Sequence, residues 1–319
     1  MIPWKILALT AIAMLAFAGN SLLCRLALRN TAIDPVTFTS IRIVAGAIML
    51  AMIVAIRDRK YAGLGSWSCA VPLFAYAICF SLAYVSLPAG IGALLLFGAV
   101  QVTMIGYGFF TGDRFRWQQW IGILIAIAGL VSLVAPSWLS FSNSTLVVNP
   151  MGADQVLSQD AQAQIDLAEP TDELLDKMTF AIGSSLMLIA GVSWGIYSLM
   201  AKGVGDPTVV TARNFLRAVP LVIFCSIVLG GRASLDLNGV IYAITSGAIT
   251  SGIGYTIWYM AVRSLEPTIA ATVQLSVPVL AGIAGYLFLG EQINLRQFVA
   301  SCAVMGGVAI VIINKKQPS

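Results

Sequence analysis

The chain has 319 residues, of which 59% are hydrophobic and 10% are charged, and its mean hydropathy is +0.90. Soluble domains carry about 25% charged residues, so this composition excludes a soluble globular protein and predicts a membrane protein. The 18 basic and 14 acidic residues give a net charge of +4, and histidine, the commonest proton relay and metal ligand, is absent from the sequence.

Apolar segments long enough to cross a bilayer recur along the chain. A transmembrane helix needs about 20 mostly apolar residues. In chain order, the candidates are residues 6–24, 36–56, two spans within 61–112 separated by Ser-Leu-Pro-Ala-Gly at 86–90, 117–136, 178–201, 209–229, 237–262, 267–290 and 297–314. The sequence therefore predicts an all-α integral membrane protein with ten transmembrane helices.

The first of these segments has an alternative interpretation. Lys5, the apolar run and Ala16-Phe17-Ala18 resemble a cleavable signal peptide with a small-residue cleavage site. The apolar run continues past that site to Leu23, and a matching stretch lies in the middle of the chain. We therefore expect a transmembrane helix.

Lysine and arginine predict the orientation, because the cytoplasmic loops of membrane proteins carry an excess of both. With the N-terminus inside, the cytoplasmic segments hold ten of them: Lys5, Arg57, Arg59, Lys60, Arg114, Arg116, Lys202, Arg263, Lys315 and Lys316. The opposite side holds five: Arg25, Arg29, Lys177, Arg232 and Arg296. We expect both termini in the cytoplasm and a multi-pass protein of the bacterial inner (plasma) membrane.

Two stretches far apart in the chain share one pattern. Residues 17–25 read FAGNSLLCR and residues 194–202 read WGIYSLMAK; each begins with an aromatic and a small residue and places a cation eight residues on. Further landmarks recur in the same order: Asp34-Pro35 and Asp206-Pro207, Pro88 and Pro267, and Gly112-Asp113 and Gly290-Glu291. We predict two five-helix repeats, residues 1–137 and 179–319. Because five is odd, the second repeat is inverted, and inverted repeats place a binding site near the midplane.

A polar segment, residues 138–178, separates the predicted repeats. Seven of the 14 acidic residues lie between Asp154 and Asp176, and the predicted orientation places the segment in the periplasm. We expect a solvated, partly disordered linker with one short helix near residues 161–167. A periplasmic lid or partner-binding site is the alternative, which only the length of the segment favours.

These features resemble the EamA-type carriers of the drug/metabolite transporter superfamily. The likeness rests on the five-plus-five plan, the aromatic-to-cation pattern of the first helix of each repeat, the proline before helices four and nine, and Gly-Asp or Gly-Glu before helices five and ten. It covers nearly the whole chain except residues 138–178. The resemblance implies a solute carrier, often an exporter of amino acids, metabolites or drugs, with a central cavity, and it leaves the substrate open.

Polar and aromatic side chains inside the predicted spans are candidates for the substrate site. A polar side chain in hydrocarbon is costly unless it faces a cavity or a partner helix. Such side chains can bind carboxylates, ammonium groups or rings. The candidates are Asn20, Tyr76, Tyr84, Gln101, Trp194, Tyr197, Arg217, Tyr255, Trp258 and Gln274. Hydrogen bonding between helices is the alternative role for each.

Three arginines lie inside predicted spans. Arg42 and Arg213 lie about 9 Å into their spans at about 1.5 Å per residue, so we expect their side chains to reach the lipid headgroups. Arg217 lies deeper, about 15 Å from Pro207, so it either caps a carbonyl group, meets a polar pocket or binds an anionic group of a substrate.

The sequence favours a secondary transporter, an exporter, facilitator or exchanger of small organic solutes such as amino acids or related metabolites. A membrane enzyme would need paired carboxylates, histidines or an activated nucleophile within the spans, whereas the acids lie at span ends or in loops. The chain has no G-x-x-x-x-G-K-S/T loop, which excludes an ATP-driven pump made of this chain alone. A non-transporting receptor or scaffold that uses the acidic segment remains the alternative.

The same residues predict the partners and the energetics. We expect a solute and the lipid bilayer as partners, no nucleic acid, no cofactor and no metal, and a monomer or weak homodimer. The five cysteines lie in apolar runs without the spacing of a disulfide framework or metal site. Because histidine is absent and no carboxylate is expected to be buried, we expect no obligatory proton stoichiometry.

Overall fold

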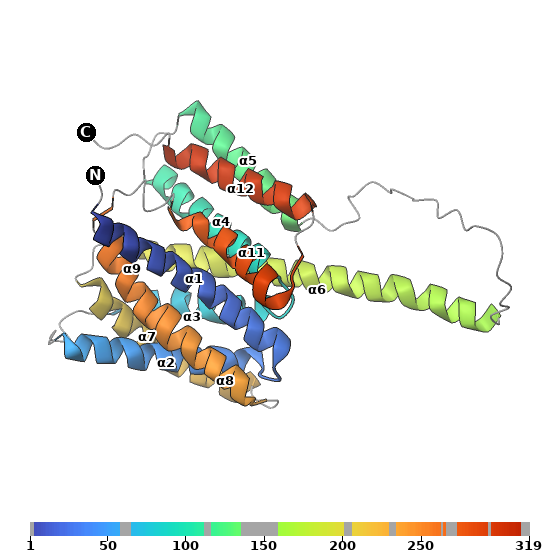
Figure 1. The fold of residues 1–319 in the computed structure, drawn as a ribbon, viewed down its shortest axis with the longest axis horizontal. Coiled ribbons are helices and arrows are strands. Elements are labelled where there is room, and N and C mark those ends of the chain that lie inside the picture. The colour runs from blue at the N-terminus through green and yellow to red at the C-terminus, as the bar shows by residue number, and fades with distance from the viewer. Residues whose placement is uncertain are drawn as a thin grey trace.

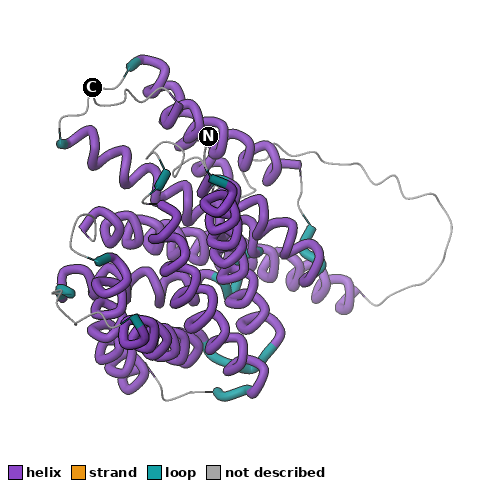
Figure 2. Tube along the Cα trace, turned by 60° about the vertical axis from the view of Figure 1, so that its left-hand side comes forward, coloured by secondary structure: helices purple, strands orange, loops and turns teal. Residues whose placement is uncertain are grey.

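The computed structural model describes residues 3–57, 65–111, 116–134, 159–200, 206–229, 234–262, 264–265, 273–292 and 295–313. These residues form helices and short connections, and no strand occurs among them (Figure 2). The helices are α1 (Trp4–Asn30), α2 (Pro35–Ile56), α3 (Trp67–Ala83), α4 (Ala89–Phe110), α5 (Trp117–Val134), α6 (Gln159–Met200), α7 (Pro207–Leu229), α8 (Leu237–Ile244), η2 (Thr245–Ile253), α9 (Gly254–Val262), α11 (Ser276–Leu289) and α12 (Leu295–Ile313).

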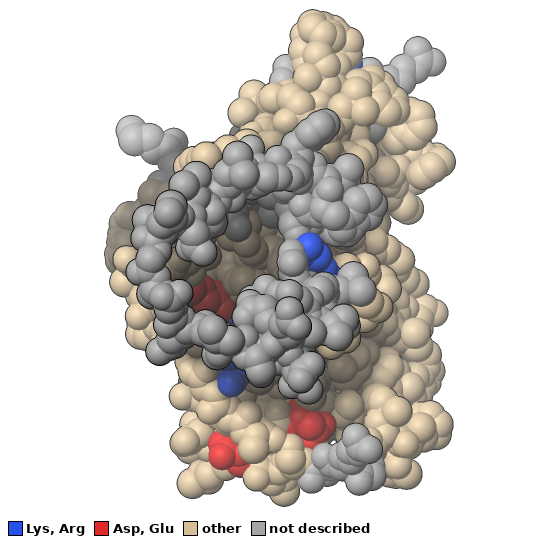
Figure 3. Space-filling model, turned by 90° about the vertical axis from the view of Figure 1, so that its right-hand side faces the viewer, with Lys and Arg blue, Asp and Glu red and all other residues tan. Residues whose placement is uncertain are grey.

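Several of these helices can cross a membrane. In the described part of the chain, six segments are long and apolar enough: Trp4–Asn30, Pro35–Ile56, Ala89–Phe110, Leu175–Met200, Pro207–Leu229 and Leu237–Val262. Four shorter apolar helices cover Trp67–Ala83, Trp117–Ser132, Ser276–Leu289 and Gln297–Val311. Among the described residues, few charged side chains are visible on the face shown in Figure 3. The protein is thus a multi-pass helical membrane protein, while the count of ten spans and the side of the termini stay predictions.

The two Asp-Pro landmarks begin equivalent helices. The Asp34 carboxylate accepts hydrogen bonds from the backbone N–H groups of Val36 and Thr37 at 3.0 and 2.9 Å, and α2 begins at Pro35. Asp206 accepts from the Thr208 N–H at 2.9 Å, and α7 begins at the proline between them. Aspartate is a preferred N-cap and proline a preferred first helical residue, so each pair fixes a helix start.

The packing of the helices repeats when the two halves of the chain are exchanged. α3 packs on α6 as α9 packs on α1, and α4 packs on α6 as α11 packs on α1. Three pairs of corresponding helices pack on each other: α2 with α7, α4 with α11, and α5 with α12. Figure 1 shows the last two pairs side by side. This set of contacts is the one expected if a two-fold axis relates the two halves.

Glycines allow two of these pairs to pack backbone to backbone. A Cβ added to Gly122 of α5 would lie 2.6 Å from the Gly307 carbonyl oxygen of α12. A Cβ added to Gly90 of α4 would lie 2.7 Å from the Gly282 Cα of α11. Small residues permit this close approach of membrane helices.

The sixth helix is longer than the sequence analysis predicts. α6 runs for 42 residues, and its N-terminal part projects beyond the other helices in Figure 1. The short helix expected near residues 161–167 is therefore the first part of α6 and not a separate element. The preceding part of the predicted linker, residues 138–158, lies outside the described residues.

Candidate functional site

Aromatic side chains from both halves of the chain meet in the interior. The rings are Phe17 of α1, Tyr76 and Phe80 of α3, Tyr84 directly after α3, Trp194 and Tyr197 of α6, Phe215 of α7, and Tyr255 and Trp258 of α9. We call these residues the ring cluster. Neighbouring centroids lie between 4.7 and 6.1 Å apart, in the tilted or edge-to-face arrangements that aromatic pairs prefer. They form one continuous set of ring contacts across the junction of the halves.

Trp194 connects the two halves within the ring cluster. Its ring centroid lies 4.8 Å from that of Tyr76, 5.1 Å from that of Tyr255 and 5.3 Å from that of Tyr197. Tyr76 belongs to the first half of the chain and the other rings to the second. Any movement of one half against the other therefore changes the surroundings of Trp194.

A polar network lies against the ring cluster. Asn20 Nδ2 donates to the Tyr76 hydroxyl at 3.5 Å, and the hydroxyls of Ser246 and Thr250 donate to Asn20 Oδ1 at 2.7 and 3.2 Å. All four side chains are buried. Because Oδ1 accepts from two hydroxyls, the Asn20 amide nitrogen is directed to Tyr76.

The two hydroxyl donors lie on η2, a π-helix. π-Helical turns close their hydrogen bonds five residues back, and they are frequent at functional sites. A Cβ added to Gly247 of η2 would overlap the Arg42 carbonyl oxygen of α2. Glycine at this position therefore lets η2 approach the α2 backbone, with its hydroxyl side chains next to the polar network.

Arg42 is buried beside this network, so the expectation that its side chain reaches the headgroups is wrong. The residue is 2% exposed, and its guanidinium carbon lies 4.7 Å from the Phe80 ring centroid and 5.5 Å from that of Tyr76. Nη2 donates to the Tyr76 hydroxyl at 3.0 Å, whereas Nη1 has no hydrogen-bond partner among the described residues. Depth along a helix axis does not determine which face carries the side chain, and here that face packs on α3.

The rings do not fully compensate the burial of this charge. A desolvated cation–ring contact contributes about 2 kcal/mol. Removing an ion from water costs several kcal/mol unless a counter-ion and hydrogen bonds replace the lost hydration. Glu291 pairs with Arg25 and Arg29, and neither of these ion pairs includes Arg42.

An ion pair joins the two halves at the end of the bundle where α1 ends. Arg25 Nε donates to Glu291 Oε1 at 3.1 Å, and the two side chains are 10% and 8% exposed. Arg25 Nη1 also donates to the carbonyl oxygens of Tyr84 and Val85, and the Ala89 N–H donates to Glu291 Oε2 at 2.7 Å. We call Arg25 and Glu291 the latch. Since the Glu291 side chain is only 8% exposed, the expectation that no carboxylate is buried is wrong.

Gly290 explains how Glu291 reaches the latch. Gly290 follows α11 and adopts a left-handed conformation with φ of 63°, which ends the helix. The Glu291 N–H then donates to the Gly285 carbonyl oxygen at 3.2 Å, which directs the chain back along α11. The Gly-Glu landmark in the sequence is thus a helix end that places a carboxylate.

Hydrogen bonds also join the halves at the opposite end of the bundle. Arg57, directly after α2, donates from Nη1 to the Thr208 hydroxyl at 3.3 Å. The Ser66 N–H, directly before α3, donates to Asn214 Oδ1 at 3.2 Å. Both contacts connect the first half to α7.

The structure brings together most, but not all, of the predicted site residues. Asn20 lies in the polar network, and Tyr76, Tyr84, Trp194, Tyr197, Tyr255 and Trp258 lie in the ring cluster. Gln101 is buried in α4 and Gln274 is half-buried just before α11; both stand outside these two groups as defined. Arg217 lies beside Gly65 near the start of α3, where its Nη1 donates to the Arg213 carbonyl oxygen at 3.4 Å.

The sequence analysis omitted Arg42, Ser246 and Thr250 from the site. An arginine within an apolar run is itself a signal of a functional site, because a charge in a membrane is costly. Ser246 and Thr250 lie four residues apart in an apolar segment, so both face one side of a helix, and this spacing was the available signal for them.

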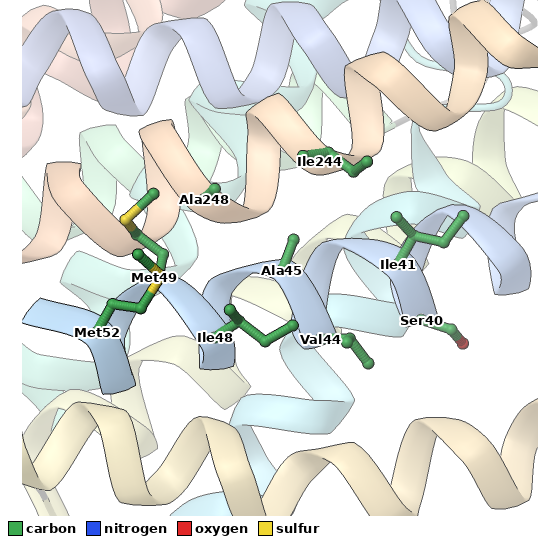
Figure 4. A pocket seen from close by; sticks show the side chains of 9 residues that line it. All are labelled: Ser40, Ile41, Val44, Ala45, Ile48, Met49, Met52, Ile244 and Ala248. Carbon is green, nitrogen blue, oxygen red and sulfur yellow. The ribbon is translucent and has the colours of Figure 1, made fainter.

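A concave feature lies beside α2, outside the ring cluster and the polar network. A groove of about 490 Å³ lies between α2 and the α8–η2 segment and is lined by Ser40, Ile41, Val44, Ala45, Ile48, Met49, Met52, Ile244 and Ala248 (Figure 4). Ile48 and Met52 are more than half exposed. The lining offers almost no polar group for orienting a solute, so the groove is suited to lipid chains and is not the candidate site.

The fold and the interior define a class: a multi-pass helical membrane protein whose two halves meet at aromatic and polar side chains. The sequence characteristics of the EamA-like transporter family occur twice in the chain, over residues 4–135 and 181–313. The chain belongs to this family, which confirms the resemblance drawn from the sequence.

Known relatives agree with this assignment. An uncharacterized protein of Pseudomonas aeruginosa is 43% identical, over 97% of this chain and 94% of that protein. A protein of Escherichia coli named a probable amino-acid metabolite efflux pump is 22% identical, over 74% of this chain and 71% of that protein. A crystal structure with 17% sequence identity has a TM-score of 0.61 over 97% of both chains, which shows a shared fold alone.

Proposed function

We propose that this transporter is a secondary carrier that exports or exchanges small organic solutes, such as amino acids or related metabolites, across the bacterial inner membrane. The ring cluster, the polar network and Arg42 form its solute site. Ten spans, arranged as inverted repeats over residues 1–137 and 179–319 with both termini in the cytoplasm, surround that site, and residues 138–178 connect the repeats in the periplasm.

One observation carries this proposal: the polar and aromatic interior is built at the junction of the two halves. Asn20, Arg42 and Tyr76 come from the first half, whereas Trp194 and Tyr255 come from the second. A site at the junction of two repeats changes its access when one repeat moves against the other. The E. coli relative, whose name refers to amino-acid metabolite efflux, supports the solute class.

Contacts at both ends of the junction fit alternating access. The latch joins the halves where α1 ends, and Arg57 and Ser66 join them to α7 at the opposite end. With both sets formed, the site is closed at both ends. Breaking the latch alone opens the site to one side of the membrane, and breaking the α7 contacts alone opens it to the other.

Metabolite analysis of growing cells tests this function. Cells that overproduce the protein should release one or more amino acids or related metabolites into the medium, with a matching fall inside the cells. Cells producing equal amounts of a Trp194→Ala variant serve as the control and should release less. An unchanged medium in both strains, with normal membrane insertion of the protein, would contradict the proposed function.

A further inference from the structure

We propose that Arg42 binds the carboxylate of the transported solute. This inference rests on the proposed function and adds the substrate class, a solute with a carboxylate and an apolar or aromatic side chain. The site is the guanidinium of Arg42 together with Asn20 and Tyr76.

The geometry leaves part of the guanidinium available. Arg42 Nη2 donates to the Tyr76 hydroxyl at 3.0 Å, and Nη1, although buried, has no partner in the described parts of the chain. Asn20 Nδ2 donates to the same hydroxyl at a long 3.5 Å. Two donors from different helices therefore converge on one oxygen, and a carboxylate offers the further acceptor oxygens that they lack.

The charge balance points to the same ligand. The Arg25 side chain, the other well-buried arginine with described contacts, is paired with Glu291 and two backbone carbonyls. Arg42 has aromatic rings and one phenol hydroxyl in these positions. Burial of a cation costs less free energy when an anion pairs with it. The carboxylate of a bound solute would supply that anion while the solute occupies the site.

A purely structural role explains the position of Arg42 less well. Cation–ring packing accounts for the contacts with Tyr76 and Phe80, but packing alone does not require a charged residue. The ordinary role of an arginine in a membrane helix, extension to the headgroups, is excluded by its 2% exposure. A guanidinium with a free nitrogen suits recognition of a planar carboxylate.

The surrounding side chains limit what the solute can be. The rings next to Arg42 are those of Tyr76 and Phe80, and the Trp194 ring packs on Tyr76. The polar groups of the network are uncharged amide and hydroxyl groups. A cation such as a polyamine would be repelled by Arg42, whereas an amino acid can place its carboxylate on Arg42 and its side chain against the rings.

Paired ligands test this assignment on the full-length purified protein. The probes are L-leucine and L-phenylalanine, each compared with its amide, which has the same side chain and ammonium group without the carboxylate. Binding is measured as the ligand-dependent rise in the unfolding temperature in detergent. We expect at least one of the acids to bind and its amide to bind at least about tenfold more weakly, since a charge-assisted hydrogen bond is lost.

Substitutions of Arg42 test whether this residue causes the stronger binding of the acid. Arg42→Gln should lower the affinity for the acid at least about tenfold and remove the preference over the amide. Arg42→Met, which fills a similar space without charge, provides the same test if the glutamine variant does not fold. Arg116→Gln removes one exposed charge directly before α5, away from the site and from the contacts that join the halves, and should behave as the unchanged protein.

The outcomes separate the inference from the function on which it rests. Equal binding of acid and amide, no binding of either acid, or an unchanged preference in both Arg42 variants would overturn the carboxylate assignment. If acids bind through Arg42 but do not cross proteoliposome membranes, the assignment stands and the transport function fails. If amides cross as fast as acids, transport stands and the assignment fails.

Discussion

At the scale of single residues, the site depends on how one tryptophan is held. Trp194 contacts three tyrosine rings from both halves of the chain. In the repeated sequence pattern, it is the counterpart of Phe17. Aromatic pairs contribute about 0.5–1.5 kcal/mol beyond their buried area. A solute whose side chain stacks on this ring would therefore lose a measurable part of its affinity without it.

Trp194→Ala should weaken solute binding about tenfold while leaving a folded protein, because the ring is part of the solute site. Ligand-dependent thermal shifts and gel filtration measure the two properties. Trp117, which is 69% exposed at the start of α5, provides the control, and Trp117→Ala should bind as the unchanged protein does. Equal losses in both variants would remove Trp194 from the site.

Residue chemistry predicted much of this interior, and the failures have physical causes. Asn20 and six of the aromatic candidates meet in the polar network or the ring cluster. The position of the Arg42 side chain was predicted wrongly because only the depth of the residue along its helix was considered, and not the helix face from which the side chain extends. Ser246 and Thr250 were missed because hydroxyl side chains in a helix commonly bond the backbone four residues back, as Thr250 also does to the Ser246 carbonyl oxygen, so their presence alone does not indicate a site.

At the scale of helices, charged groups at helix ends fix how neighbouring elements meet. Asp34 caps α2 and also accepts a hydrogen bond from the Ser234 N–H at 3.1 Å, just before α8. Desolvation raises the pKa of Asp34, but the hydrogen bonds from Thr37, Ser234 and Val36 outweigh it, so this pKa lies below its usual value. The ionised carboxylate thus stabilises the folded state.

Asp34→Ala should lower the free energy of unfolding by about 1 kcal/mol near neutral pH, the usual loss for an N-cap. Because the folded pKa is the lower one, this contribution is complete above the unfolded value of about 3.9 and disappears as pH falls through the folded value. Unfolding in detergent at several pH values measures it. Asp34→Asn keeps a capping side chain and should lose less; an Asp34→Ala effect that grows as pH falls would contradict this role.

The latch is the second charged helix end, and its two members should depend on each other. Glu291→Gln removes the carboxylate that pairs with the buried Arg25, and Arg25→Gln leaves Glu291 with only the more distant Arg29, whose Nη1 lies 3.9 Å from Oε1. Removing one partner of a buried pair typically destabilises by about 3–5 kcal/mol. The double variant should lose less than the sum of the two single losses, by about 1 kcal/mol or more. Unfolding of all four proteins gives this coupling energy. Strictly additive losses would show that the pair does not close the junction.

At the scale of the whole molecule, hydropathy and the repeated landmarks predicted the order of the helices but not every boundary. The helix contacts repeat when the halves are exchanged, and the family assignment falls on residues 4–135 and 181–313. The length of α6 was not predicted, because polarity was interpreted as a linker. Its first residues, Gln-Asp-Ala-Gln-Ala-Gln, are mostly good helix formers, and their propensity was the neglected signal.

Energy coupling is a property of the whole molecule, and the carboxylate of the latch raises the question whether transport is coupled to protons. A proton-coupled carrier needs an ionisable group in the membrane whose protonation changes during the cycle. In the parts of the chain that the structure describes, Glu291 is the buried carboxylate, and it is held by Arg25 and the Ala89 N–H. We expect this carboxylate to close the junction rather than carry protons.

Counterflow in proteoliposomes tests the central claim, transport by an uncoupled carrier, most directly. Vesicles containing the purified protein are loaded with unlabelled L-leucine or L-phenylalanine, the proton gradient is collapsed, and the same labelled amino acid is added outside. The account predicts transient uptake of label into protein-containing vesicles, above that of protein-free vesicles. Absence of counterflow for these and the other amino acids would contradict transport of this solute class, and uphill accumulation driven by a pH gradient alone would contradict the uncoupled mechanism and implicate Glu291.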